Sequence, residues 1–291
     1  MSKISIRFFG DTPLRAVWSD EHGKWFFSVT DAVSAIRGVK DYEKNRNYWK
    51  YLKTKLKREG SQLVSATNRL KLTAPDGKKR NADVLDADGI ILLASEFPAK
   101  IASDFTAWFT RSDDTLDSKS IKKAYALFDS ELLESIEVGT VRGLRQIHSY
   151  LFGGLYDFAG QIRRLNIAKG GFQFANVLYL DETLKAVENL PEGSFDEIIR
   201  KYVEMNVAHP FMEGNGRSMR IWLDLMLKKN LSVCIDWSKV EKHDYLEAMR
   251  RSVFDIKPIS ELLRPALTDR IFDREVFMKG IDYSYYYETE E

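Results

Sequence analysis

The stretch from residue 209 to residue 220, H-P-F-M-E-G-N-G-R-S-M-R, holds residue types that could act on a phosphate compound. His209 could accept a proton from a hydroxyl group, because imidazole titrates near physiological pH. Glu213 offers a hard oxygen ligand, of the kind that holds a magnesium ion while the ion keeps water and phosphate ligands. The pair predicts a base and a metal ligand in one loop.

The residues that follow Glu213 are suited to bind an anion. Gly214 and Gly216 allow positive φ angles and a close approach of the backbone to a ligand, and free N–H groups at a helix start attract negative charge. Arg217 and Arg220 lie one helical turn apart, so both guanidinium groups can reach one polyphosphate.

Each feature also has a purely structural interpretation. A His-Pro pair commonly ends a helix, a Gly-Asn-Gly run is usually a turn, and a glutamate with two arginines at helical spacing is usually a solvated face. Together and in this order, the residues favour a phosphate-binding catalytic loop. It is not a Walker loop, because the lysine and the spacing differ. Apolar residues at helical spacing in segments 195–208 and 221–227 predict that the loop joins two helices.

The composition is that of an ordinary globular protein of 291 residues, 44% hydrophobic and 30% charged. The net charge of +1 conceals an asymmetry: residues 1–115 carry 20 Lys and Arg against 15 Asp and Glu, whereas the remainder carries 24 against 28. Because the two parts of the chain have net charges of opposite sign, two domains are favoured, and the positively charged first domain could bind a polyanionic partner.

The single cysteine, Cys234, excludes an internal disulfide and a cysteine metal cluster, and its apolar neighbours favour an inert core thiol. The first residues are too polar for a signal peptide, and no apolar stretch is long enough to span a bilayer. We therefore expect a cytoplasmic protein with no membrane partner, although a secretion system without a cleaved signal would leave no trace here.

The first part of the chain mixes strand and helix patterns. Strands are predicted at residues 3–9, 15–18 and 24–29, with His22 in a surface turn. A further turn is predicted at residues 76–79, between the apolar runs 70–72 and 82–85. Helices are predicted at residues 32–36, capped by Thr30 and Asp31, and at residues 88–95 and 102–110.

Residues 40–58 are rich in lysine and arginine, with interleaved aromatic residues at Tyr42, Tyr48, Trp49 and Tyr51. This mixture could contact the phosphates and bases of a nucleic acid. The alternative is a helix whose aromatic residues pack inward, and the shared face of Trp49, Leu52 and Leu56 favours it for the aromatic residues. The lysines remain available for a DNA contact.

Several short runs in this part occur together in an order that is typical of one protein family. They are Trp18, G-K-W-F-F-S-V at 23–29, N-Y-W at 47–49, Leu52-Lys53 and E-G-S-Q-L at 59–63. They resemble the BRO-N domain of phage antirepressors and viral BRO proteins over about residues 5–110. The resemblance implies a small α+β domain associated with DNA binding or phage-type regulation.

Residues 111–120 are polar and charged, and they mark the expected boundary between a domain of residues 1–112 and a second of residues 113–291. From residue 121 on the pattern is helical, with predicted helices at 136–150, 237–249 and 260–267. We interpret His148 as satisfied by local hydrogen bonds and His243 as exposed. Apolar runs at 165–167 and 172–174 around a glycine turn predict a β-hairpin. Its edge could receive an extended peptide; a plain surface hairpin is the alternative.

Segment 209–220 matches the Fic-domain signature at every defined position, and the second part resembles a Fic domain over about residues 120–291. Fic proteins mostly transfer AMP from ATP to a hydroxyl side chain of a target protein. The resemblance implies a mainly α fold with a short β-hairpin flap, near 163–176, on which the target docks. The resemblance implies that His209 is the base and that Phe211 anchors the loop. It also implies that Glu213 binds Mg²⁺ and that Arg217 and Arg220 bind the outer phosphates. The anion cradle that it implies is formed by Gly214, Asn215 and Gly216.

The tail S-Y-Y-Y-E, from Ser284 to Glu288, resembles the inhibitory motif Ser/Thr-x-x-x-Glu-Gly/Asn of Fic proteins that carry a C-terminal inhibitory helix, expected here at about 281–290. The resemblance implies that the glutamate pairs with Arg220, which then cannot hold the γ-phosphate of ATP. Thr289 departs from the motif. Tyr285 is a candidate for self-modification; a tyrosine packed at the domain surface is the alternative.

These observations predict a protein adenylylyltransferase (AMPylator) that uses ATP and Mg²⁺ and is autoinhibited by its C-terminal helix. Two alternatives remain: a de-AMPylase in which Glu288 positions a water, or a phage-type DNA-binding regulator with a quiescent Fic module. The sequence leaves open the target protein, the modified residue, the nucleotide and whether the chain forms a homo-oligomer.

Overall fold

The computed structural model describes residues 4–74, 78–110, 116–169 and 171–288. The chain divides into two compact units, Met1–Ser112 and Asp113–Glu290. The division falls between residues 112 and 113, within the charged connector of residues 111–120. Thr289, Gly170 and the connector residues 111–115 lie outside the described residues.

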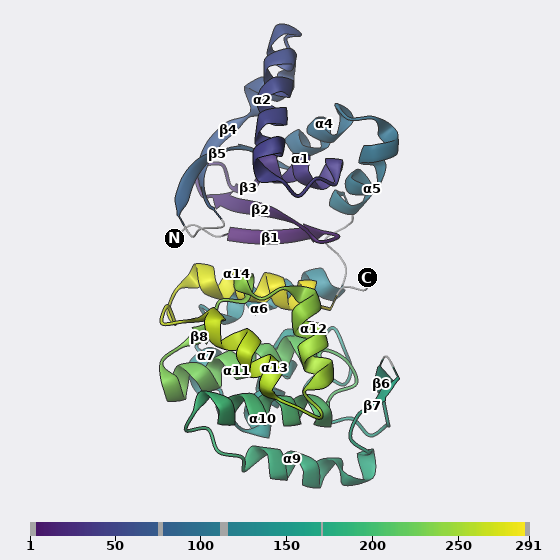
Figure 1. Cartoon of the computed structure of the whole chain (residues 1–291), viewed down its shortest axis with the longest axis vertical. Coiled ribbons are helices and arrows are strands. Elements are labelled where there is room, and N and C mark those ends of the chain that lie inside the picture. Colours follow the sequence, from purple (N-terminus) through teal and green to yellow (C-terminus); the bar gives the residue numbers. More distant parts are fainter. Residues whose placement is uncertain (1–3, 75–77, 111–115, 170, 289–291) are drawn as a thin grey trace. The chain divides into compact units, whose positions relative to one another are not determined.

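Unit 1 is an antiparallel sheet with helices on one side (Figure 1). The strands, in the order β1-β2-β3-β5-β4, are β1 (Ile4–Phe9), β2 (Thr12–Ser19), β3 (Lys24–Ser28), β5 (Lys79–Leu85) and β4 (Asn68–Thr73). The helices are α1 (Val29–Arg37), α2 (Tyr42–Arg58), α3 (Gln62–Ala66), α4 (Ala87–Ser95) and α5 (Ala99–Phe109). The predicted α+β character of this unit is confirmed.

The strands of unit 1 alternate between two apolar faces, as a period of two residues requires. Leu14 and Phe27 point into the core shared with the helices, whereas Val17 and Phe26 belong to a smaller cluster on the other face. Trp49 of α2 is 3% exposed and packs into the helical core, which confirms the inward packing inferred for that aromatic residue.

The start of α1 differs from the prediction of a Thr30–Asp31 cap. The side chain of Ser28 caps the helix by accepting a hydrogen bond from the Asp31 N–H. The Asp31 carboxylate instead pairs with Arg15 of β2, with 2.7 Å between Nε and Oδ2. A buried carboxylate is more stable beside a guanidinium than beside a single backbone N–H, so the cap falls to the serine.

Unit 2 is mainly helical, as predicted. Its helices are α6 (Leu116–Leu127), α7 (Leu132–Ser135), α8 (Val141–Phe152), α9 (Leu180–Glu188), α10 (Phe195–Ala208), α11 (Asn215–Leu231), α12 (Lys242–Arg251), α13 (Lys257–Leu263) and α14 (Arg274–Tyr286). Short elements complete it: η1 (Val177–Tyr179), η2 (Trp237–Lys239), η3 (Arg264–Ala266), and the strand pairs β6 (Ala168–Lys169) with β7 (Phe172–Gln173) and β8 (Cys234–Ile235) with β9 (Leu267–Thr268).

Helix α11 is the centre of unit 2, because it packs against α8, α10 and α14 and is buried along most of its length. Figure 1 shows α11 running between α10 and α14. Cys234 is buried in β8, and burial raises the pKa of its thiol to about 12, consistent with an inert core residue. Within the described residues, no helix combines the length and the apolar character needed to cross a membrane.

Several predicted element bounds were wrong. The predicted helix at 136–150 starts only at Val141, where Thr140 caps it by accepting from the Gly143 N–H. The helix expected at 237–249 is broken between η2 and α12, and that expected at 260–267 runs over α13 and η3. The final helix begins at Arg274 rather than near residue 281, because the Asp273 side chain accepts from two backbone N–H groups there, and it ends at Tyr286.

Two adjacent leucines test the register of α4. Leu93 is fully buried and Leu92 is 48% exposed. We expect Leu93→Ala to lower the free energy of unfolding by about 2–5 kcal/mol, because it leaves a cavity in the core. Leu92→Ala should change it by less than about 0.5 kcal/mol. Urea unfolding of the full chain measures both, and equal effects would contradict this register.

Candidate active site

The predicted loop joins α10 to α11 and begins at a strained residue. His209 caps α10 with a φ of 48°, and only one other non-glycine residue in the described part of the chain has a positive φ. Such a conformation is unfavourable for a residue with a Cβ and needs support from its surroundings. Arg163 supplies it by donating from Nε to the His209 carbonyl at 2.8 Å and from Nη2 to the Ala208 carbonyl at 3.1 Å.

The His209 ring is held as a neutral imidazole. It stacks on Phe174, with 3.7 Å between ring centroids, and its Nδ1 lies 3.2 Å from the carbonyl oxygen of Asn206. A carbonyl only accepts, so Nδ1 carries the proton and Nε2 keeps the lone pair. Burial lowers the pKa of His209 to about 4, so the ring is uncharged at neutral pH and can accept a proton through Nε2.

The two glycines of the loop serve different purposes. Gly214 has a φ of 78°, and a Cβ there would lie 2.4 Å from the Phe152 ring. Gly216 has no positive φ, which corrects the expectation that both glycines supply one. It lies in the first turn of α11, where a Cβ would come within 2.1 Å of Oε1 of Glu288. Position 216 therefore needs glycine because another group approaches closely.

Asn215 and Phe211 fix the shape of the loop. The Asn215 side chain accepts from the Phe211 N–H at 2.9 Å and donates to the Phe211 carbonyl at 2.8 Å, so it closes the loop on itself. Phe211 is fully buried and stacks on His148, with 3.8 Å between ring centroids. Any contact of residue 215 with an anion would therefore come from its backbone N–H.

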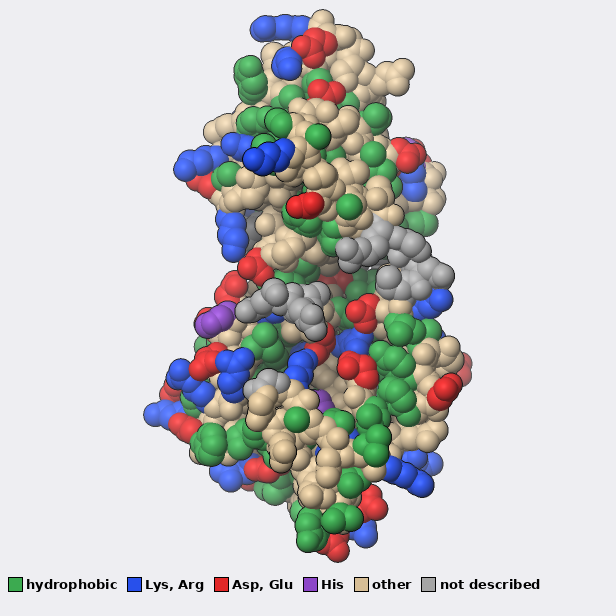
Figure 2. Space-filling model, turned by 90° about the vertical axis from the view of Figure 1, so that its right-hand side faces the viewer, with side chains coloured by type: hydrophobic (Ala, Val, Ile, Leu, Met, Phe, Trp, Pro, Cys, Tyr) green, Lys and Arg blue, Asp and Glu red, His purple; other side chains and the backbone are tan. Residues whose placement is uncertain are grey.

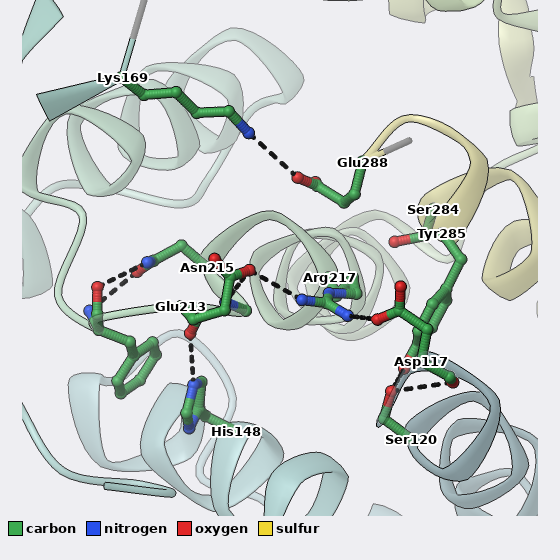
Figure 3. A network of polar contacts seen from close by, with 12 residues as sticks. Asp117, Ser120, His148, Lys169, Glu213, Asn215, Arg217, Ser284, Tyr285 and Glu288 are labelled. Carbon is green, nitrogen blue, oxygen red and sulfur yellow. Dashed lines mark hydrogen bonds and ion pairs between the residues drawn. The ribbon is translucent and has the colours of Figure 1, made fainter. Parts of the chain in front are cut away.

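Arg217 lies between two carboxylates (Figure 3). Its Nη1 pairs with Asp117 of α6, and its Nη2 lies 2.8 Å from Oε1 of Glu213. The guanidinium group also faces the rings of Phe152 and Tyr285. It is 5% exposed, and its Nε is buried without a hydrogen-bond partner in the described part of the chain. Asp117 lies in the segment that the sequence marked only as a polar connector, so its role was missed.

Glu213 is the sequence-predicted metal ligand, and its surroundings fit a magnesium ion that keeps most of its own ligands. The side chain is 55% exposed, and its Oε1 accepts from Arg217 and from the Gly214 N–H at 2.9 Å. The described residues contain no group of three or more acidic, histidine or cysteine side chains that could form a metal cage. One exposed carboxylate suits Mg²⁺, which is commonly held by one or two carboxylates and by substrate phosphates.

Arg220 is 3% exposed and is engaged by the tail of the chain. It donates from Nε to Ser284 Oγ at 2.8 Å and from Nη2 to the Ser284 carbonyl at 2.7 Å. Nη2 also lies 2.5 Å from Oε1 of Glu288, so the contact predicted from the tail is present. Burial alone would raise the pKa of Glu288, but the charge of Arg220 lowers it below its ordinary value. The carboxylate is therefore ionised at neutral pH.

The remaining tail residues dock against the helical unit, as their apolar character indicated. Tyr287 is 3% exposed, and its hydroxyl donates to the Val240 carbonyl at 2.7 Å. The Tyr285 hydroxyl donates to Ser120 of α6 at 2.8 Å, and burial raises its pKa to about 12. Its self-modification stays a prediction.

The hairpin near residues 163–176 is anchored to the loop. Arg163 donates to the Leu165 carbonyl at 2.6 Å and also to the Ala175 carbonyl, so one guanidinium group binds both ends of the hairpin. At the tip, Lys169 Nζ lies 3.7 Å from Oε2 of Glu288 (Figure 3). Both strands are shorter than predicted. The first begins at Ala168 rather than at Leu165, whose carbonyl bonds to Arg163, and the second begins at Phe172 as predicted. No pattern in the sequence identifies Arg163 or Phe174 as a support of His209.

The other histidines are hydrogen-bonded or exposed as expected, but the partners of His148 are not local, because they lie 12 and 65 residues away in the sequence. His148 is fully buried with a hydrogen bond at each ring nitrogen, to the Gly160 N–H and to the Glu213 carbonyl. Burial lowers its pKa to about 4. His22 is exposed, as is His243, whose side chain is 83% exposed.

The lowered pKa values of His209 and His148 predict a specific pH dependence. In the unfolded chain a histidine titrates near 6.5, so the unfolded state binds protons first as the pH falls. The free energy of unfolding should therefore decrease from about pH 6.5 to about pH 4. Histidine ring signals in NMR spectra give the direct check, with His209→Gln to assign one of them. Titration of either buried ring between pH 6 and 7 would contradict the prediction.

Comparisons with known proteins agree with this geometry. A model of the Fic/DOC family matches residues 139–227, which include the loop and most of α8–α11. Protein adenylyltransferase VbhT of Bartonella schoenbuchensis is 30% identical over 147 residues, 46% of this chain and 30% of that protein. The probable protein adenylyltransferase y4lH of Sinorhizobium fredii is 31% identical over 153 residues, 47% of this chain and 79% of that protein.

Among solved structures, the BepC protein of Bartonella tribocorum with bound AMPPNP is similar over 53% of this chain and 84% of that chain, at 18% identity and a TM-score of 0.45. The chain thus spans less than a third of VbhT but more than three quarters of y4lH. The length of y4lH that is matched, together with the family model over the loop and its flanking helices, shows that this chain belongs to the Fic/DOC family.

Proposed function

We propose that this chain is a protein adenylyltransferase, which transfers AMP from ATP to a hydroxyl side chain of a target protein. The observation that carries the proposal is the neutral His209 at one end of a loop whose other end presents two buried arginines. The names of VbhT and y4lH agree with this activity.

The reaction that the loop supports is an in-line displacement at the α-phosphorus of ATP. Nε2 of His209 takes the proton of the target hydroxyl as its oxygen forms a bond to the phosphorus, and the bond to the β-phosphate oxygen breaks to release pyrophosphate. Arg217 and Arg220 would bind the outer phosphates, and the N–H groups at the start of α11 would face the anion. Glu213 would hold Mg²⁺, which when bound supplies positive charge beside the phosphate oxygens.

The resting site is autoinhibited in this proposal. Glu288 and Ser284 use the hydrogen-bonding groups of Arg220 that a γ-phosphate would need. The Glu288 carboxylate also lies against Gly216, at the helix start where phosphate oxygens would bind. A negative charge there repels ATP, so the tail must move before the outer phosphates can bind productively.

The target would dock on the hairpin near residues 163–176. Its short strands leave backbone groups at an edge that an extended peptide could join. Phe174 of the same segment stacks on His209, so a peptide held there would bring its hydroxyl close to the base.

Removal of Glu288 tests the proposal. We expect Glu288→Gly to transfer label from α-labelled ATP to protein at a rate between about ten and one hundred times that of the unchanged chain, because a buried charge-assisted hydrogen bond is lost. Gel autoradiography of the chain with a cell lysate measures the transfer.

A double variant serves as the control for this experiment, and a pre-adenylylated target tests the reverse reaction. Glu288→Gly with His209→Ala is the matched blank, because it lacks the base. No labelled protein from Glu288→Gly would contradict AMP transfer. Loss of label from a pre-adenylylated target exposed to the unchanged chain would favour the de-AMPylase alternative.

A second activity, DNA binding by unit 1, is supported by its exposed basic side chains. Lys50 and Lys57 lie seven residues apart on the solvent side of α2, and Lys71 is exposed on the neighbouring β4–β5 hairpin. Trp49 and Lys53 fix α2 to this hairpin through Asp83, at 2.8 Å each. Figure 2 draws the face of unit 1 that lies on the side of α4 and α5 in Figure 1, and Lys and Arg side chains also stand out at the upper end and along the left-hand side of that face.

A charge reversal tests this second activity. We expect the full chain to bind duplex DNA with an affinity that falls as salt rises, and Lys50→Glu with Lys57→Glu to reduce the slope of log affinity against log salt by about 2. Lys229→Glu with Lys257→Glu, an equal change of net charge in unit 2, is the control. Fluorescence anisotropy gives the slope. If the chain does not bind duplex DNA, or binds it with an affinity that does not change with salt, the result would contradict DNA binding by unit 1.

A further inference from the structure

The peptide unit between Glu213 and Gly214 has a fixed orientation. The Glu213 carbonyl points to Nε2 of His148, at 2.9 Å (Figure 3). The C=O and N–H of a planar trans peptide point in opposite directions, so the Gly214 N–H faces away from His148. It donates to Oε1 of Glu213 at 2.9 Å, the same oxygen that accepts from Nη2 of Arg217. The orientation of this peptide therefore fixes the carboxylate and, through it, one guanidinium group.

Nothing in the local backbone would by itself keep the peptide in this orientation. A glycine follows it, and glycine adopts conformations on both sides of φ zero at little cost. A flipped peptide would aim the Glu213 carbonyl oxygen at the side where the phosphates of ATP are expected, and an oxygen dipole there would repel them. The His148 hydrogen bond opposes that flip.

His148 can donate this hydrogen bond because its tautomer is determined. The Gly160 N–H donates to Nδ1 at 2.9 Å, so Nδ1 carries the lone pair and the proton lies on Nε2. The ring is fully buried, stacks on Phe211 and contacts the tilted ring of Phe152, with 3.8 and 4.8 Å between centroids. Its orientation is therefore held by ring contacts and by a hydrogen bond at each nitrogen.

We propose that His148 is a positioning residue for nucleotide binding, which holds the Glu213–Gly214 peptide with its N–H toward the phosphate side of the loop. This inference rests on the proposed function, because it takes ATP as the ligand of the loop. His148 itself touches neither the phosphates nor the target, and acts through the peptide and the Glu213 carboxylate.

Two substitutions separate this role from simple core packing. The amide of His148→Asn reaches the position of Nδ1 and keeps the bond from Gly160, whereas that of His148→Gln reaches the position of Nε2 and keeps the bond to Glu213. Each variant retains one of the two hydrogen bonds, so their losses of stability should be similar. Only the glutamine variant retains the contact that orients the peptide.

The affinity for Mg-ATP, measured by calorimetry in a Glu288→Gly background, is the first readout. We expect His148→Asn to weaken binding about tenfold or more, since a buried carbonyl loses its donor, and His148→Gln to stay within about threefold of its parent. Thermal unfolding shows whether each variant folds. Equal affinities for the two variants would overturn the proposal.

A second measurement uses the unchanged chain and needs no variant to fold. The ¹⁵N NMR spectrum of the imidazole rings at neutral pH should show His148 as the Nε2–H tautomer, and the Nδ1–H form would overturn the proposal. A Glu288→Gly parent that binds no ATP would instead overturn the proposed function, whatever the tautomer, so the two failures are distinguishable.

Discussion

Two buried guanidinium groups on the central helix α11 determine much of the structure around the loop. Arg217 and Arg220 are 5% and 3% exposed, and the removal of each charge from water costs several kcal/mol unless nearby groups offset it. Asp117 and Glu213 offset the first, and Ser284 and Glu288 the second. Three parts of the chain that are distant in sequence, α6, the loop and the segment from Ser284 at the end of α14 to Glu288, are thereby brought to one place.

The same constraint explains why the loop is suited to an anion. Without Glu288, Arg220 would remain a buried cation that lacks an anionic partner in the described part of the chain. A phosphate group could take the place of the carboxylate with little rearrangement, since both accept hydrogen bonds from the same guanidinium edge. The tail therefore occupies the position of the proposed ligand rather than merely covering it.

The loop could be predicted from the sequence because its functional residues lie next to one another in the chain. The base, the carboxylate, the glycines and the arginines follow within twelve residues, and the Ser284–Glu288 spacing places both groups on one side of a helix end. The supports of the loop were missed because they come from far along the chain: Arg163 lies 46 residues from His209, and Asp117 lies 100 residues from Arg217. Element bounds were wrong where a side chain cap decided them, as at Asp273.

The close approach of Glu288 to Gly216 makes the residue that fits at position 216 depend on the residue at position 288. Since Gly216 needs no unusual backbone angle, the docked tail is what excludes a side chain there. A chain without Glu288 would lose this restriction, and the nearest groups to a Cβ at position 216 would then be Nη1 and Nη2 of Arg220, each at 3.1 Å. In a chain that keeps Glu288, a Cβ at position 216 would require the Glu288 carboxylate to shift from the place where it pairs with Arg220.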